Sequence, residues 1–209
     1  MEPTPGNDSD PSIRQQSVDK IRSAAMKCFA TKGVNAASLR EVAQEADVSV
    51  GLVQHYFASK ADLVAAVDDQ VLTVFGALVE ATRSDGSEPE ASKLGGVFAQ
   101  LVYENPTMTR YIARALTEGG QVGRTIFTGL LEISETQRDL FAARAMTRTD
   151  LDPLWGALHP LILRIAPFIL RAHVERHLPG PFQTPSELQR WDSEVTALIR
   201  IGQDKRDPT

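Results

Sequence analysis

The chain has 209 residues, of which 42% are hydrophobic, and a formal net charge of −5. This length and composition allow one or two buried cores, so independent folding needs no disulfide or structural metal. The single cysteine, Cys28, excludes an intrachain disulfide and indicates a reducing compartment. No apolar run approaches the roughly 20 residues of a membrane-spanning helix, and the acidic first residues lack the apolar centre of a signal peptide. We therefore expect a cytoplasmic protein with no membrane partner.

Charge is distributed unevenly along the chain. Residues 12–60 carry seven lysines and arginines against four carboxylates, which gives this segment a net charge of +3. Because the whole chain has a net charge of −5, the remaining residues together carry −8. A basic N-terminal segment on an acidic body is the asymmetry expected when only one end of a protein meets phosphate.

Helical periodicity dominates the whole sequence, and no segment shows the sustained alternation of a strand. We therefore predict an all-α fold of about nine helices. The expected helices outside the central motif are 13–31, 59–83, 91–104, 107–118, 121–146, 153–178 and 185–201. Gly33 is placed to end the first of them in a left-handed C′ conformation. Asp152 with Pro153, and Thr184 with Pro185, mark two helix starts by a capping residue followed by proline.

Residues 38–57, SLREVAQEADVSVGLVQHYF, have the pattern of a helix-turn-helix. Apolar residues recur at helical spacing in the first half, where Ser38 and Glu41 form an S-x-x-E capping box. Residues 47–49 interrupt the pattern, and a second short helix follows. In such a unit the second helix enters the major groove of DNA, where base edges carry a distinguishable code.

The helix expected at 153–178 is apolar on more than one face, so it should be buried on two sides. With the last helix it could form a four-helix bundle across a homodimer interface, although a larger intrachain core would also bury it. The predicted interface residues are Leu161, Ile165, Phe168, Ile169, Leu188, Trp191, Val195, Leu198 and Ile199.

With these elements in order, the chain resembles the tetracycline-repressor (TetR) family of bacterial transcription regulators. Residues 17–67 carry the resemblance, which beyond about residue 80 is limited to the helical plan. The matching residues are Phe29, Gly33, Ser38, Val42-Ala43, Val48-Ser49, Gly51, Tyr56-Phe57 and Ser59-Lys60.

Two positions depart from the family pattern. Asp47 stands where glycine is usual, and aspartate tolerates the left-handed region that the turn needs. Gln54 stands where tyrosine is common, and its amide can form two hydrogen bonds with adenine, at N6 and N7.

The resemblance implies which residues meet DNA. Val50, Leu52, Gln54 and His55 would face the groove. Phosphate contacts would come from Ser38, Arg40, Tyr56, Lys60 and the backbone at Ser49, with Gly51 in the same helix. Tyr56 could alternatively belong to the core, and Arg40 and Lys60 could be solvated charges.

The resemblance also implies a pocket for a small-molecule effector within the C-terminal helices, usually walled by apolar side chains. The candidate lining residues are Phe75, Phe98, Tyr103, Met108, Tyr111, Phe127, Trp155 and His159. The implied organisation is a tail at 1–11, a DNA-binding domain at 12–58, an effector-binding and dimerisation domain at 59–202, and a tail at 203–209.

We therefore predict a homodimeric, sequence-specific regulator, a repressor released from a palindromic double-stranded DNA operator by an unknown effector. One alternative is a helical dimeric interaction protein whose motif does not bind DNA, and another is a small helical enzyme. No catalytic motif stands out, so we expect no enzyme activity, cofactor or metal. His173 and His177 have metal-clip spacing, but a solvated pair is the simpler interpretation.

Overall fold

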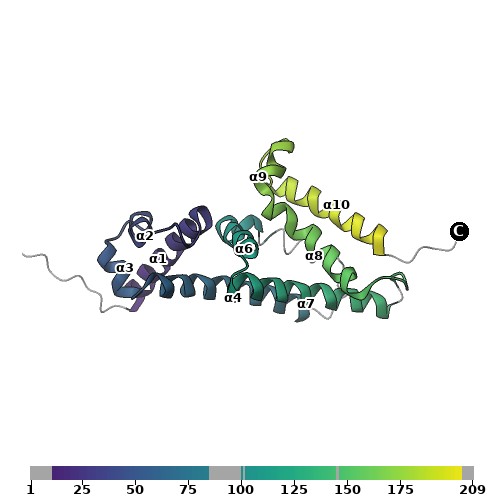
Figure 1. Cartoon of the computed structure of the whole chain (residues 1–209), viewed down its shortest axis with the longest axis horizontal. Coiled ribbons are helices and arrows are strands. Elements are labelled where there is room, and N and C mark those ends of the chain that lie inside the picture. Colours follow the sequence, from purple (N-terminus) through teal and green to yellow (C-terminus); the bar gives the residue numbers. More distant parts are fainter. Residues whose placement is uncertain (1–10, 85–99, 101, 145, 204–209) are drawn as a thin grey trace, which may run out of the picture. The chain divides into compact units, whose positions relative to one another are not determined.

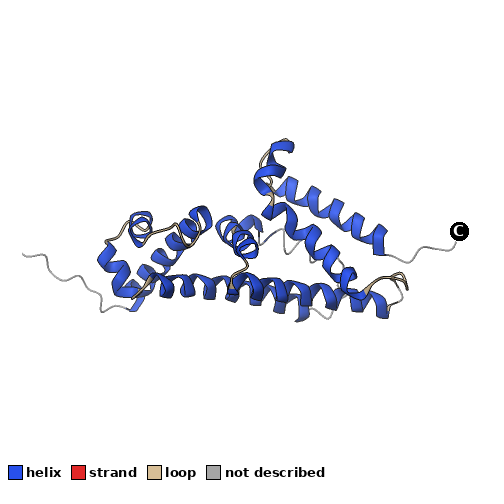
Figure 2. Cartoon of the chain, viewed as in Figure 1, coloured by secondary structure: helices blue, strands red, loops and turns tan. Residues whose placement is uncertain are grey.

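The computed structural model describes residues 11–84, 100, 102–144 and 146–203, and within these ranges the chain folds into nine α-helices and one 3-10 helix. Figure 2 shows helices and connecting loops only, which confirms the all-α prediction. The helix expected at 91–104 lies mostly outside the described residues. The chain divides into two compact units, Met1–Val71 and Leu72–Thr209.

The first unit contains α1 (Pro11–Lys32), α2 (Leu39–Glu45), α3 (Val50–Tyr56) and the beginning of α4 (Lys60–Ser84), labelled in Figure 1. Its core is built from residues that recur at three- and four-residue intervals, as helical faces require. The fully buried side chains include Ile21, Ala25, Phe29, Val42, Ala43, Val53, Leu63 and Val67. α1 ends as expected, because Gly33 adopts a φ of 85° and its N–H donates to the Phe29 carbonyl at 2.9 Å.

The second unit continues along α4 and adds α6 (Pro106–Glu118), α7 (Gln121–Ala143), α8 (Pro153–Ile169), α9 (Arg171–Val174), the 3-10 helix η1 (Glu175–His177) and α10 (Pro185–Gln203). Helix α7 packs against both α6 and α8. α6 and α7 approach closely at Gly123, where a Cβ atom would lie 2.1 Å from the carbonyl oxygen of Ala115. Only glycine fits this crossing.

The prediction of one helix over 153–178 is wrong at its C-terminal end. Asp152 caps the start as expected, accepting hydrogen bonds from the N–H groups of Leu154 and Trp155. However, α8 ends at Ile169 and the chain bends by 70°. After the bend, the Glu175 carboxylate accepts from Arg171 and from the N–H of Phe182. These contacts hold Phe182 against Phe168, with ring centroids 5.2 Å apart, and no local periodicity signals them.

Helix α10 is fixed against α8 by a half-buried polar cluster. The Arg164 guanidinium donates to the Asp192 carboxylate at 2.6 Å and to the Thr196 hydroxyl at 3.2 Å.

Among the described helices, none is by itself long and apolar enough to cross a membrane. Pro153–Ile169 and Arg171–His177 reach that length and composition only as a bent pair.

Candidate functional site

Local hydrogen bonds fix the two short helices of the motif. The Ser38 hydroxyl accepts from the Glu41 N–H at 3.2 Å, and the Glu41 carboxylate accepts from the Ser38 N–H at 2.8 Å. This reciprocal pair confirms the predicted capping box of α2. At the start of α3, the Ser49 hydroxyl accepts from the Leu52 N–H at 3.1 Å. Both helices therefore begin at residues whose side chains replace missing backbone partners.

Asp47 makes the turn between α2 and α3. Its φ of 50° lies in the left-handed region, and within the described residues no other non-glycine residue has a positive φ. The Val48 N–H then donates to the Ala43 carbonyl at 3.0 Å. The structure thus confirms that aspartate is accommodated in the turn conformation that glycine normally supplies.

α3 presents one side to solvent and one to the core. Val53 is fully buried, whereas Gly51, Gln54 and His55 are exposed and Val50 is half-buried. Leu52 is half-buried as well. Of the four residues predicted to face a DNA groove, Gln54 and His55 are therefore exposed, whereas Val50 and Leu52 are half-buried.

Gly51 has no steric reason within the protein to be glycine. A Cβ atom there would meet only the Ser49 hydroxyl, at 3.8 Å, and the backbone is helical. Glycine in a helix costs up to about 1 kcal/mol relative to alanine. Nothing within the described residues therefore requires glycine at this position.

Acidic partners engage two of the basic side chains around the motif. Lys27 pairs with Glu45 and Lys32 with Glu41, tying α1 to α2, while the Lys60 ammonium donates to the Asn35 carbonyl. Ser38 and Arg40 are exposed, and in the described ranges Arg40 has no ion pair. Arg40, the lysine or arginine of α2, is therefore available to bind an external anion. The sequence alone could not show which charges were already paired.

The capping carboxylate has a strongly shifted pKa. The Lys32 ammonium, followed by the Ser38 N–H and hydroxyl, lowers the pKa of Glu41 from 4.5 to about 2. Because the folded state favours the ionised form, this stabilisation is present above pH 4.5 and is lost as the pH falls through about 2. The α2 cap is therefore intact at neutral pH.

Tyr56 lies at the end of α3 and is half-buried. Its ring meets the His55 imidazole edge-on, with centroids 5.2 Å apart. The hydroxyl oxygen is buried and has no hydrogen-bond partner within the described residues. A buried hydroxyl normally finds a partner, so Tyr56 retains an unused hydrogen-bonding group next to the exposed face of α3.

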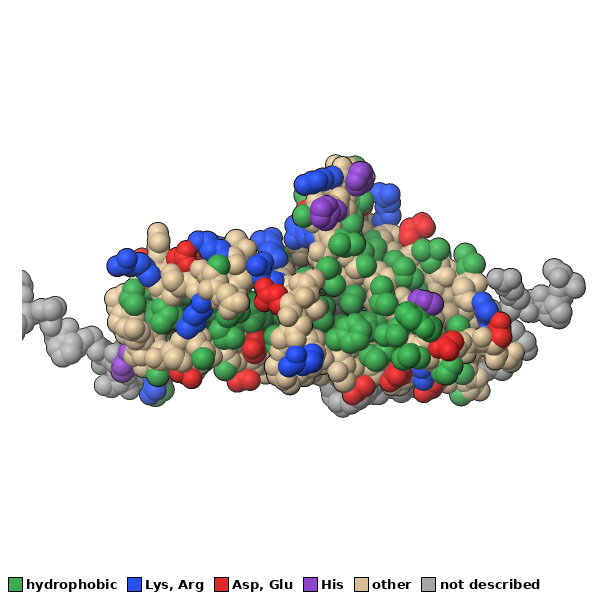
Figure 3. All heavy atoms as spheres, in the orientation of Figure 1, with side chains coloured by type: hydrophobic (Ala, Val, Ile, Leu, Met, Phe, Trp, Pro, Cys, Tyr) green, Lys and Arg blue, Asp and Glu red, His purple; other side chains and the backbone are tan. Residues whose placement is uncertain are grey.

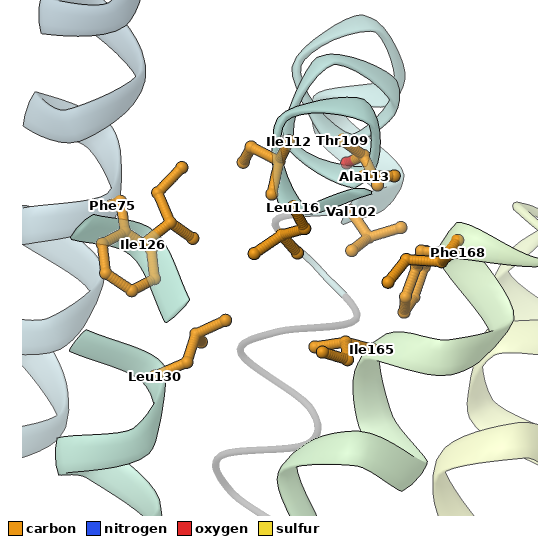
Figure 4. A pocket seen from close by; sticks show the side chains of 11 residues that line it. Phe75, Val102, Thr109, Ile112, Ala113, Leu116, Ile126, Leu130, Ile165 and Phe168 are labelled. Atoms are coloured by element: carbon orange, nitrogen blue, oxygen red, sulfur yellow. The ribbon is translucent and has the colours of Figure 1, made fainter. Parts of the chain in front are cut away.

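The second unit contains an apolar pocket of about 480 Å³, a volume that includes the solvent at its opening. Figure 4 shows side chains from several helices converging on it. Its lining residues are Phe75 of α4, then Val102, which precedes α6, then Thr109, Ile112, Ala113 and Leu116 of α6, Ile126 and Leu130 of α7, and Ile165, Phe168 and Ile169 of α8. The Phe75 ring lies over Gly129 of α7, where an added Cβ atom would be 2.7 Å from the ring.

Comparison with known families decides the assignment of the N-terminal unit. Residues 21–67, from the middle of α1 into α4, match the family model of the bacterial regulatory proteins of the tetR family. This segment is a TetR-type DNA-binding segment. The matched segment contains the capping box, the Asp47 turn and the exposed face of α3.

Two relatives named as HTH-type regulators match part of the chain. The chain is 29% identical over 117 residues to the Probable HTH-type transcriptional regulator YttP of Bacillus subtilis, an alignment covering 54% of this chain and 56% of YttP. It is 27% identical over 135 residues to the HTH-type transcriptional regulatory protein RaaS of Mycobacterium tuberculosis, covering 64% and 61%. Each alignment spans less than two thirds of the relative. The fold matches SmeT, the repressor of the Stenotrophomonas maltophilia multidrug efflux pump SmeDEF, with a TM-score of 0.68, 19% identity and 90% coverage of both chains.

The described pocket differs from the set of residues predicted to line one. Of that set, Phe75 lies on the pocket wall. Met108 and Tyr111 are buried, Phe127 is half-buried, and none of the three lines the described pocket. Tyr103, Trp155 and His159 are exposed, the last two with stacked rings 5.0 Å apart, and Phe98 lies outside the described residues. Aliphatic residues of α6, α7 and α8, which were not predicted to line a pocket, form most of the described wall.

The residues predicted for a dimer interface are mostly buried within the single chain. Leu161, Ile165, Phe168, Leu188 and Val195 are buried. Ile169, Trp191 and Ile199 are half-buried, and Leu198 is exposed. The exposed large apolar residues of α8 and α10 are Leu154, Trp155, Ile162, Leu163, Leu170, Leu198 and Ile201.

His173 and His177 are exposed and belong to different elements, α9 and η1. Within the described parts of the chain, no three His, Cys, Asp or Glu side chains are placed to hold a metal ion.

Proposed function

We propose that this protein is a sequence-specific DNA-binding transcriptional regulator that acts as a homodimer and is released from its operator by a small molecule. One observation carries the proposal. Within a segment that matches the TetR family model, α3 is capped at Ser49 and leaves Gly51, Gln54 and His55 exposed on one face. A helix of this kind fits the DNA major groove.

The polar groups around this face divide into two roles. Ser38, Arg40 and Lys60 and the α3 cap at Ser49 hold phosphates and set the register of the protein on DNA. The side chains at the middle of α3, Val50, Leu52, Gln54 and His55, meet base edges and thymine methyl groups. Arg40 supports the first role, because it is exposed and has no ion pair within the described residues. The Tyr56 hydroxyl is buried and would reach a phosphate only if its side chain moved.

The exposed apolar face of α8 and α10 supports the homodimer. Figure 3 shows hydrophobic side chains over this part of the second unit, and Leu198 and Ile201 are 58% and 73% exposed. Large exposed apolar patches mark interaction sites, and a two-fold dimer uses the same patch on both copies. Two recognition helices would then bind a roughly palindromic operator. Because that operator is bacterial DNA, the proposal places the protein in the cytoplasm.

In this proposal, a ligand bound in the pocket regulates DNA binding. α4 is one continuous helix that begins at Lys60, beside the motif, and carries Phe75 on the pocket wall. A ligand that fits the pocket in only one arrangement of α4 would shift the population toward that arrangement, provided that its affinity for the two states differs. SmeT is described as a repressor, and we propose repression, relieved by ligand, for this chain as well.

Substitutions at Arg40 and Gln54 test the proposed roles. We expect Arg40→Ala to weaken binding equally for all DNA sequences and to reduce the salt dependence by about one phosphate contact. Gln54→Ala should instead cost about 1–3 kcal/mol on the operator and relax discrimination at one base pair. Fluorescence anisotropy with the upstream DNA, single-base variants and a scrambled duplex measures both. The proposal fails if wild-type protein binds the upstream and scrambled duplexes equally.

A further inference from the structure

The effector pocket has walls of one chemical kind. Of its eleven lining residues in the described part of the chain, ten are aliphatic or aromatic hydrocarbon side chains, and Thr109 contributes the single polar side chain. Figure 4 shows the hydrocarbon groups of Phe75, Ile112, Leu116, Leu130 and Ile165 directed toward a common space. Apart from Thr109, this described wall lacks the polar groups that usually orient a ligand.

The single hydroxyl of the wall is already engaged. Thr109 Oγ1 donates its hydrogen to the Asn105 carbonyl at 2.9 Å, one turn earlier in α6. Its proton is therefore not free to bind an acceptor on a ligand, although its oxygen can still accept one hydrogen bond. A ligand hydroxyl can be accommodated here, whereas a ligand anion gains nothing from this group.

The described wall itself carries no charged side chain. Two arginines adjacent to wall residues are paired with carboxylates, Arg114 with Glu118 and Arg164 with Asp192. A third, Arg110, follows Thr109 and is exposed. Transfer of an unpaired carboxylate or ammonium group into an apolar site costs many times more than transfer of a neutral group. The described lining residues therefore disfavour ligands that bury a charge, because none of them carries a compensating charge.

We propose that the effector is an uncharged molecule whose buried surface is almost entirely hydrocarbon, with at most one hydroxyl or carbonyl near Thr109. This assignment rests on the proposed function of the pocket as the effector site. It excludes fatty-acid anions and cationic amphiphiles as ligands that bury their charged group in the pocket.

A matched pair of probes tests the assignment on the full-length protein. Dodecanol and dodecanoate share one alkyl chain and differ in charge at about pH 8. Dodecanol is titrated below its aqueous solubility limit, and dodecanoate below its micellar concentration, against the neutral fluorophore N-phenyl-1-naphthylamine bound to the protein. We expect dodecanol to displace the fluorophore at a concentration at least about tenfold lower than dodecanoate. Equal or tighter binding of dodecanoate overturns the assignment, and so does failure of both probes to bind.

A pair of threonine variants on α6 locates the binding. Thr109→Lys places an ammonium group at the pocket wall, while Thr117→Lys makes the same change at an exposed position of the same helix. We expect Thr109→Lys to shift the preference toward dodecanoate by about tenfold or more, and Thr117→Lys to leave it unchanged. If Thr109→Lys does not fold, tryptophan at Leu130 should exclude both probes. An unchanged preference in Thr109→Lys, or undiminished binding in Leu130→Trp, overturns the location.

The two proposals fail separately. Binding of the ligand-free protein to upstream DNA tests the regulator, and probe binding in the absence of DNA tests the pocket. If DNA binding is present and the dodecanol preference is absent, only the ligand class is wrong. If the dodecanol preference is present and no DNA is bound, only the regulatory function is wrong.

Discussion

Replacement of Gly123 by alanine is expected to lower the free energy of unfolding by about 2 kcal/mol. The new Cβ atom would lie 2.1 Å from the Ala115 carbonyl oxygen and 2.7 Å from its carbon. These are backbone atoms within α6, so they cannot rotate away as a flexible side chain would, and α6 and α7 must separate. Chemical denaturation followed by circular dichroism measures the loss.

Gly76 provides the matched control for this substitution. It is also a helical glycine, but it is exposed and a Cβ atom there meets nothing within 4 Å. Gly76→Ala should therefore raise the free energy of unfolding by about 0.5–1 kcal/mol through helix propensity alone. If both variants change stability in the same direction, the close crossing of α6 and α7 does not exist in solution.

Gly51→Ala is expected to separate stability from DNA binding. The protein leaves open space at this position, so alanine should leave stability unchanged or raise it by up to about 1 kcal/mol. Affinity for the operator should nevertheless fall by at least about tenfold, because an added methyl group would hold the sugar-phosphate backbone away from the start of α3. Anisotropy titrations on the operator and denaturation curves on the same protein sample give the two numbers.

Gly76→Ala again serves as the control, since it makes the same chemical change sixteen residues along α4 from Lys60, the residue of that helix proposed to contact DNA. Its operator affinity should equal that of the wild type. Wild-type affinity in Gly51→Ala would show that no partner approaches α3 at this residue, and the interpretation of Gly51 would be withdrawn.

The motif could be predicted from sequence because short-range contacts determine it. Ser38 with Glu41, and Ser49 with Leu52, are pairs three residues apart, so the pattern of residue types is enough to identify them. The same holds for Asp47, whose left-handed φ follows from its place between two apolar-patterned helices. Fold class and helix starts depend on the same local signals.

The pocket could not be predicted in this way, because its wall is assembled from residues far apart in the chain. Ile112 and Ile165 carry no local mark that distinguishes a pocket wall from a core. The pocket-lining residues predicted from sequence instead included Trp155 and His159, which stack on each other at the surface. Only the packing of α6, α7 and α8 against each other decides which apolar side chains border an open volume.

The orientation of α8 was ambiguous for a related reason. The helix is apolar on several sides, so periodicity cannot say which side packs within the chain. The structure buries Leu161 and Ile165 in the second unit and exposes Ile162 and Leu163. The proposed dimer surface therefore lies beside the stripe that was expected to form it.

The most direct test of the regulatory function is a hydroxyl-radical footprint of the purified protein on the DNA upstream of its gene. Two recognition helices related by a dimer axis should protect two symmetric half-sites, with centres about one helical turn, roughly 34–36 Å, or a little more apart. Protection should weaken as salt is raised. Uniform cleavage along the whole fragment, or protection without two-fold symmetry, would contradict the account.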